Sequence, residues 1–145
     1  MIPVIAAAAA ALAIPIIATP AAADDYDESC YAYEAYNSAI VVGAAGEGAA
    51  DYASKTKLDP VVMVVTDEKA DGHHVGIRLA TKQSDGDTRY WAWHENYDGS
   101  GTHTKWETYA SDSGGIVSLY FQVAIMEGDT IVGYCNTLKF SNSYW

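Results

Sequence analysis

Basic residues are scarce in this 145-residue sequence: eight Lys and Arg stand against nineteen Asp and Glu, giving a formal net charge of −11. Nucleic acids and anionic lipids are bound largely through Lys and Arg, which displace counterions from the phosphates. We therefore expect neither nucleic acid nor a membrane surface as a partner. The acidic surface is typical of a domain kept soluble by its charge, and a specific basic partner is the alternative.

Cysteine is also rare, with only Cys30 and Cys135. Two distant cysteines lack the paired spacing of a zinc site, and we expect no cofactor. Two thiols in an exported domain usually pair with each other. We predict a disulfide that joins the first strand to the last and closes a loop of about 100 residues. By lowering the entropy of the unfolded chain, such a bond would stabilise the fold by about 4 kcal/mol.

Catalytic motifs are missing as well. The sequence contains no GxSxG or HExxH pattern, and both cysteines are assigned to the disulfide. Glu95 and Glu107 are the obvious carboxylate pair for glycoside hydrolysis, but nothing in their spacing fixes the separation such a reaction needs. The sequence therefore predicts a protein without catalytic residues.

No metal site follows from the spacing of the acidic and histidine residues. His73 and His74 are adjacent, so on a strand they point to opposite faces and do not readily ligate one ion. The segment 67–72 partly resembles a calcium loop. Lys69 occupies its third position and Arg78 its twelfth, where an acidic ligand is required, so we predict no metal ligands.

The first 23 residues contain no charged side chain, and they end in three alanines before Asp24 and Asp25. An apolar stretch followed by a small-residue site is typical of a signal peptide. A membrane anchor is the alternative, but prolines interrupt the segment, and its longest unbroken run, 4–14, is too short to span a bilayer. We expect residues 1–23 to be removed and residues 24–145 to form one secreted, extracellular domain.

What the sequence does contain is a series of short apolar segments separated by Asp, Gly, Asn or Ser. Such regular spacing predicts an all-β fold, an antiparallel β-sandwich that is jelly-roll-like or immunoglobulin-like. Asp-Gly and Gly-Gly pairs supply the turns. The segments are Val61–Thr66, His74–Thr81, Arg89–Glu95, Lys105–Ala110, Ile116–Met126 and Thr130–Phe140.

Alternation of apolar and polar residues assigns the core. The inward residues are Val75, Ile77 and Leu79 in one strand and Leu119, Phe121, Val123 and Ile125 in another. The segment 30–42 is interpreted as one or two strands, and Pro60 as the first residue of another. The Gly- and Ala-rich region between Gly43 and Asp59 is interpreted as a flexible loop, with a short helix over 49–55 as an alternative.

The densest aromatic segment is 90–97. Trp91 and Trp93 lie two apart on a predicted strand, so their rings share a face, where they either stack on sugar rings or fill the core. If the loop 98–101 closes a hairpin, Trp106 falls near His94 and Glu107 near Trp93. These five residues, Trp91, Trp93, His94, Trp106 and Glu107, are the candidate ligand-binding residues.

Between Asp71 and Cys135 the sequence reads DGHHVGIRL, then YWAWHENYDGSGTHTKWETYASDSGGI, then VAIMEGD. This pattern resembles small secreted proteins of high-GC Gram-positive bacteria. It is loosely similar to the small adaptor subunits of secreted umbrella-shaped toxin particles, which join a stalk or repeat protein to a lectin-like component. The resemblance implies a non-enzymatic β domain whose N-terminal segment docks on a partner, and it assigns no individual contact residue.

The composition, the motifs and the resemblance together favour a secreted module that acts by binding. A secreted protein partner is favoured, with the acidic surface and the region 43–59 as contact regions. The alternative is a carbohydrate-binding, lectin-like module that uses the candidate tryptophans, and a small secreted hydrolase comes third.

Overall fold

The computed structural model describes residues 26–145, and the predicted signal peptide, residues 1–23, lies outside the described residues. In this part of the chain every regular element is a β-strand, and no helix able to cross a bilayer occurs. The strands are β1 (Tyr26–Tyr36), β2 (Ala39–Tyr52), β3 (Lys57–Asp67), β4 (His74–Lys82), β5 (Thr88–Tyr90), β6 (His94–Asn96), β7 (His103–Ser111), β8 (Ser118–Glu127), β9 (Thr130–Asn136) and β10 (Phe140–Ser141).

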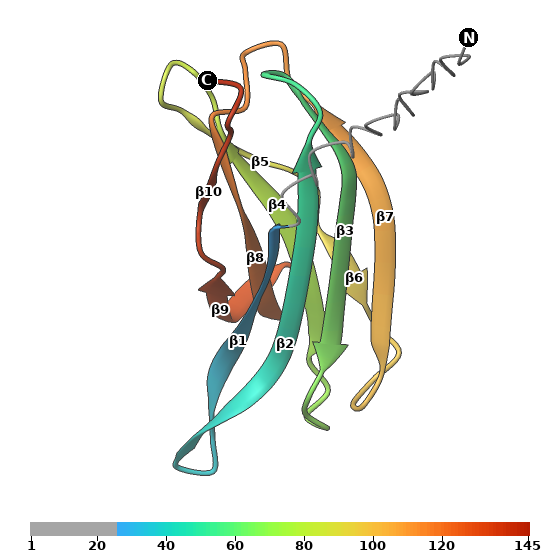
Figure 1. Cartoon of the computed structure of the whole chain (residues 1–145). Coiled ribbons are helices and arrows are strands. Elements are labelled where there is room, and N and C mark those ends of the chain that lie inside the picture. The colour runs from blue at the N-terminus through green and yellow to red at the C-terminus, as the bar shows by residue number, and fades with distance from the viewer. Residues whose placement is uncertain (1–25) are drawn as a thin grey trace, which may run out of the picture.

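The strands form two antiparallel sheets that face each other (Figure 1). The first sheet has the order β1-β2-β3-β7, and we call it sheet A. The second, sheet B, has the order β10-β8-β4-β5, with β9 also paired to β8 and β6 also paired to β4. The predicted all-β sandwich of antiparallel strands is confirmed.

The core lies between the two sheets and is built by alternation. In β4 and β8 every second residue points inward, and all seven of the side chains assigned to the core from the sequence are at most 3% exposed. Their register agrees, because Ile77 lies opposite Val123 and Leu79 opposite Phe121. Apolar side chains of β3 complete the core from sheet A.

The predicted disulfide is confirmed. It joins Cys30 on β1, the first strand, to Cys135 on β9, the last long strand, with the two Cα atoms 6.1 Å apart. The two cysteines lie on edge strands of different sheets, so the bond closes one open side of the sandwich.

The segment interpreted as a flexible loop or short helix is instead the longest strand. Strand β2 runs through the whole Gly- and Ala-rich stretch, pairs with β1 on one side and with β3 on the other, and leaves only residues 53–56 as a connection. The prediction of a mobile region over 43–59 was therefore wrong. Small residues by themselves indicate flexibility, whereas here they permit close approach between the sheets.

Glycines of β2 face large side chains of β8 across the core. A Cβ added at Gly48 would overlap the ring of Phe121, and one added at Gly46 would overlap Val123. Glycine in a strand commonly marks such a close approach. The large side chains of sheet B thus pack directly against the backbone of β2 in sheet A. The small residues of β2 leave the volume that these side chains occupy.

Replacing Gly48 by valine is therefore expected to destabilise the protein by about 1–3 kcal/mol, because the added methyls displace the Phe121 ring in a closely packed core. Urea unfolding followed by circular dichroism measures this change. The matched control is Ala49→Val, on the partly exposed outer side of the same strand, where a change within about 0.5 kcal/mol is expected. Equal effects of the two substitutions would contradict this account of the interface.

Pro60 lies inside β3 and does not begin it, so the prediction of a strand start at this residue was wrong. The pairing of β3 with β7 is irregular between Leu58 and Val61, and its pairing with β2 is irregular between Ala50 and Tyr52. A proline has no N–H to donate, and a central strand accommodates it at such a bulge.

The turns follow the sequence, with one exception. Gly72, Gly86, Gly99 and Gly115 all have positive φ, as the Asp-Gly and Gly-Gly pairs predicted. The loop 98–101, however, does not close a hairpin. It carries the chain from β6, which pairs with β4 in sheet B, to β7, which pairs with β3 in sheet A.

Candidate functional site

The two tryptophans expected on one face lie on opposite faces of sheet B. The backbone N–H of Trp91 donates to Leu79 O at 3.0 Å, and His94 pairs with Ile77. The chain therefore advances three residues, from Trp91 to His94, along a stretch where β4 advances only two, from Leu79 to Ile77. The extra residue between β5 and β6 acts as a bulge and reverses the alternation. Trp91 therefore points toward the core, whereas Trp93 points outward.

Trp91 and His94 line a small hollow on the side of the sandwich between β7 and the β5–β6 segment. Its volume of about 110 Å³ is well below the roughly 300–1,000 Å³ of ordinary ligand sites, so it has room for about one side chain. The Trp91 ring is fixed by its Nε1–H, which donates to Thr81 Oγ1 at 3.1 Å, and by the Arg89 guanidinium 4.1 Å from its centroid.

Trp106 lies near His94, as predicted, although the two come from different sheets. Their ring centroids are 5.3 Å apart, and burial lowers the pKa of His94, which favours the neutral imidazole. Glu107 does not approach Trp93, because the strand that carries it belongs to sheet A and the Glu107 side chain is exposed on the outer face of that sheet.

The carboxylate pair considered for hydrolysis is separated for the same reason. Glu95 lies on the outer face of sheet B, where its Oε1 is 3.0 Å from His74 Nε2, and Glu107 lies on the outer face of sheet A. The whole sandwich stands between them. They cannot flank one glycosidic bond.

Cationic and aromatic side chains gather instead on the outer face of sheet B. The guanidinium of Arg78 lies 4.2 Å from the Tyr90 ring centroid and 4.3 Å from that of Trp93. Tyr120 donates from its hydroxyl to that of Tyr90 at 3.2 Å, and Tyr134 lies opposite Ala124 on the same face. We call these five residues, Arg78, Tyr90, Trp93, Tyr120 and Tyr134, the aromatic–arginine patch.

Hydrogen bonds and burial fix the centre of this patch. Arg78 donates from Nε and Nη2 to Gln122 Oε1, at 2.8 and 2.6 Å, and burial lowers its pKa. Burial, followed by the hydrogen bond with Tyr90, raises the pKa of Tyr120 to about 12, so its phenol is neutral at physiological pH. Arg78 and Gln122 are thus held in place before any ligand arrives.

An open groove adjoins the patch. It has a volume of about 460 Å³, within the range of about 300–1,000 Å³ that is usual for ligand sites. Ile131 and Val132 are 40% and 41% exposed along it, and Tyr134 is 61% exposed. The groove is lined by Arg78, Gln122, Ile131, Val132, Gly133 and Tyr134.

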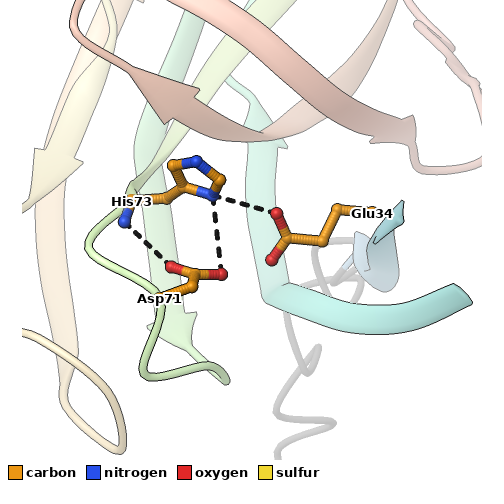
Figure 2. A group of neighbouring side chains, drawn as sticks. All are labelled: Glu34, Asp71 and His73. Atoms are coloured by element: carbon orange, nitrogen blue, oxygen red, sulfur yellow. Dashed lines mark hydrogen bonds and ion pairs between the residues drawn. The ribbon is translucent and has the colours of Figure 1, made fainter. Parts of the chain in front are cut away.

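A second polar site lies elsewhere, where β1, the β3–β4 connection and β8 meet. His73 Nδ1 is 2.9 Å from Glu34 Oε2 and 3.5 Å from Asp71 Oδ2, and the three side chains converge in Figure 2. The backbone N–H of His73 donates to Asp71 Oδ1 at 2.8 Å. On the far side of the ring, His73 Nε2 is 3.8 Å from Glu127 Oε2. We call Glu34, Asp71 and His73 the acid–histidine cluster.

The pKa values of the two carboxylates of this cluster are shifted in opposite directions. Burial, followed by the neighbouring Asp71, raises the pKa of Glu34. Burial acts in the same direction on Asp71, but its contacts with Glu34 and with the His73 backbone outweigh burial and lower its pKa. Each of the three residues offers one ligand atom, and these atoms lie within 4.8 Å of one another, so the cluster is able to hold a metal ion.

Glu34, the partner of Asp71 and His73, was not predicted from the sequence. The partner lies 37 residues before Asp71, and only the meeting of β1 with the β3–β4 connection brings them together. One feature of the sequence could have indicated Glu34. It lies four residues after Cys30 in β1, and side chains an even number of residues apart on a strand point to the same face. An inward-facing disulfide therefore implies an inward-facing carboxylate at Glu34.

The chain was also compared with known proteins. No family model matched it, and neither did any curated protein or solved structure. The resemblance to small secreted proteins and to adaptor subunits of toxin particles therefore stays a prediction.

Proposed function

We propose that this protein is a secreted, non-enzymatic binding module that engages an extracellular protein through the outer face of sheet B. The observation that carries the proposal is the aromatic–arginine patch, in which Arg78 is held by two rings and by Gln122. The disulfide between Cys30 and Cys135 supports export, because such bonds persist mainly in oxidising compartments.

The chemistry of the patch favours a protein over other partners. Tyr, Trp and Arg are the residue types that dominate binding energy at protein interfaces. Exposed Ile131 and Val132 extend the surface with aliphatic side chains, which pack against protein side chains better than against hydroxyl-rich sugars.

Arg78 indicates what the partner presents. Among the described residues no carboxylate forms an ion pair with Arg78, although the chain is strongly acidic. Lys139 adds a second positive charge, with its Nζ 5.6 Å from the Tyr120 ring centroid. A partner surface that places a carboxylate among apolar side chains would complement this face. An adaptor subunit, as the resemblance implies, is one form of such a module.

The test is affinity capture from culture supernatant with the purified protein and two double variants. Tyr90→Ala with Tyr134→Ala removes exposed rings from the patch, and Tyr31→Ala with Tyr33→Ala removes two rings, each 54% exposed, from β1 in sheet A. We expect the wild type and the sheet A variant to retain one stoichiometric secreted protein that the patch variant loses. Retention by the patch variant would overturn the proposal.

The carbohydrate-binding alternative predicts a different result in a parallel glycan array. The outward indole of Trp93 and the exposed ring of Tyr90 are the observation that favours it, because sugars stack on such rings. Glycan binding that is lost in the patch variant, with no protein captured, would replace the protein-binding proposal by the lectin-like one.

A further inference from the structure

We propose that the acid–histidine cluster is a binding site for one divalent transition-metal ion, and that Zn²⁺ is the ion whose ligand preferences it matches best. The ligands are one carboxylate oxygen each from Glu34 and Asp71 and the Nδ1 nitrogen of His73. The site shares no residue with the aromatic–arginine patch, and the proposal does not depend on the function proposed for that patch.

Two buried oxygens in the cluster point to a cation. Among the described residues, Glu34 Oε1 and Asp71 Oδ2 accept no hydrogen bond from an N–H or hydroxyl group, and their side chains are only 6% and 7% exposed. A buried polar atom without a partner is costly, and a buried charge normally has a counter-charge or a metal. In Figure 2 the two carboxylates lie side by side next to the Nδ1 side of the His73 ring, so a cation bound between them would contact both.

The spacing of the ligand atoms fits a tetrahedral ion. Zinc bonds of about 2.1 Å to nitrogen and oxygen place neighbouring ligand atoms about 3.4 Å apart in tetrahedral geometry. His73 Nδ1 is 2.9 Å from Glu34 Oε2 and 3.5 Å from Asp71 Oδ2. All three ligand atoms lie within 4.8 Å of one another, so an ion held here would have three protein ligands and a fourth position for water.

The donor types identify the class of ion. Imidazole nitrogen suits zinc and neighbouring transition metals, whereas Ca²⁺ and Mg²⁺ require six or more oxygen ligands. Two carboxylates balance the charge of a divalent ion. Metal-bound histidines usually donate their other ring N–H to a carboxylate, and Glu127 Oε2 is 3.8 Å from His73 Nε2 in that place.

The local backbone holds the Asp71 carboxylate in position and leaves space for that of Glu34. Asp71 Oδ1 is occupied by the His73 backbone N–H, which leaves Oδ2 directed at the cluster. Gly43 provides space for the carboxylate of Glu34, because a Cβ at this position would lie 2.7 Å from Glu34 Oε1. An ion bound here would join the end of β1 to the β3–β4 connection. It would therefore link the edge strand of sheet A to the segment that leads into β4 of sheet B.

The experiment is isothermal titration of the chelator-treated, purified protein with ZnCl₂, together with a thermal melt with and without Zn²⁺. The variants are Glu34→Gln and His73→Gln, with Asp71→Asn as a further variant if either fails to fold by circular dichroism. His103→Gln, on the exposed face of β7, is the matched control. CaCl₂ and MgCl₂ titrations test the class of ion.

We expect one Zn²⁺ per chain, a higher melting temperature with Zn²⁺, at least about tenfold weaker binding in both cluster variants, and unchanged binding in His103→Gln. Absence of zinc binding at millimolar metal would overturn the proposal, as would equal affinity in the cluster variants and wild type. Tighter binding of Ca²⁺ or Mg²⁺ than of Zn²⁺ would overturn the assigned class of ion.

Discussion

Replacement of Phe121 by alanine is expected to lower the free energy of unfolding by about 3–5 kcal/mol. Phe121 is the largest of the fully buried side chains in the described part of the chain. Its ring packs against Gly48 in the opposite sheet, where no side chain is present to move into the cavity that the substitution creates. The cost should therefore lie toward the upper end of that range.

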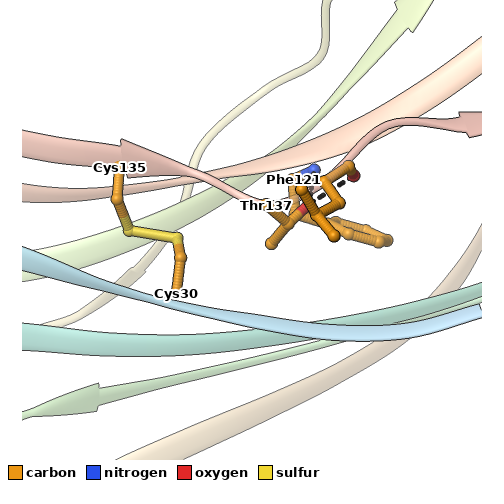
Figure 3. Close-up of a disulfide and its surroundings, with 5 residues drawn as sticks. Cys30, Phe121, Cys135 and Thr137 are labelled. Atoms are coloured by element: carbon orange, nitrogen blue, oxygen red, sulfur yellow. Dashed lines mark hydrogen bonds between the residues drawn. A yellow bond between two sulfur atoms is a disulfide. The ribbon is translucent and has the colours of Figure 1, made fainter.

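The backbone of Phe121 should stay in place in this variant. Its N–H donates to Thr137 Oγ1 at 2.9 Å, and its carbonyl accepts from the Thr137 N–H at 2.9 Å, so the substitution removes packing and leaves these bonds (Figure 3). Urea unfolding followed by circular dichroism measures the loss. Tyr31→Ala, an exposed aromatic truncation, is the control and should change stability by about 0.5 kcal/mol or less. Similar losses in the two variants would contradict the inward assignment of Phe121.

Removal of the disulfide by Cys30→Ala together with Cys135→Ala is expected to cost about 2–5 kcal/mol. The bond spans a sequence separation of 105 residues, so its loss frees a large part of the unfolded chain. The substitution also removes the covalent link between β1 and β9, the two edge strands that the disulfide joins across one side of the sandwich (Figure 3). The measurement is urea unfolding of wild type and variant.

A reducing agent supplies the control for this prediction. Reductant should lower the stability of the wild type toward that of the double variant and leave the double variant unchanged. Thiol labelling of the denatured, non-reduced wild type should find no reactive cysteine among the described residues, because neither Cys30 nor Cys135 is free. Two labelled thiols, or a double variant as stable as wild type, would disagree with the structure.

Much of the strand pattern was predictable from the sequence because it depends on short-range chemistry. In β4 and β8 the alternation of apolar residues assigned the faces correctly, since only one register buries them all. The Asp-Gly pairs located turns because positive φ is inexpensive for glycine. The disulfide followed from the count of cysteines and the expected export.

The errors arose where one sheet packs on the other. The small residues of β2 were interpreted as a flexible loop, because the large side chains of β8 that require them lie more than 70 residues later. The bulge between Trp91 and His94 has no local sequence signal, and it places the two candidate tryptophans on opposite faces. The loop 98–101 crosses between sheets, which separates Glu107 from Trp93.

By itself the sequence determined the β class, the inward faces of the regular strands, the turns and the disulfide, because each depends on neighbouring residues or on a single pair. Only the tertiary structure decided which distant residues meet. The aromatic–arginine patch draws on β4, β5, β8, β9 and the β5–β6 segment, and the acid–histidine cluster draws on β1 and the β3–β4 connection. Both result from strand order and register, which are set by the packing of the whole sandwich and not by the spacing of residues along the chain.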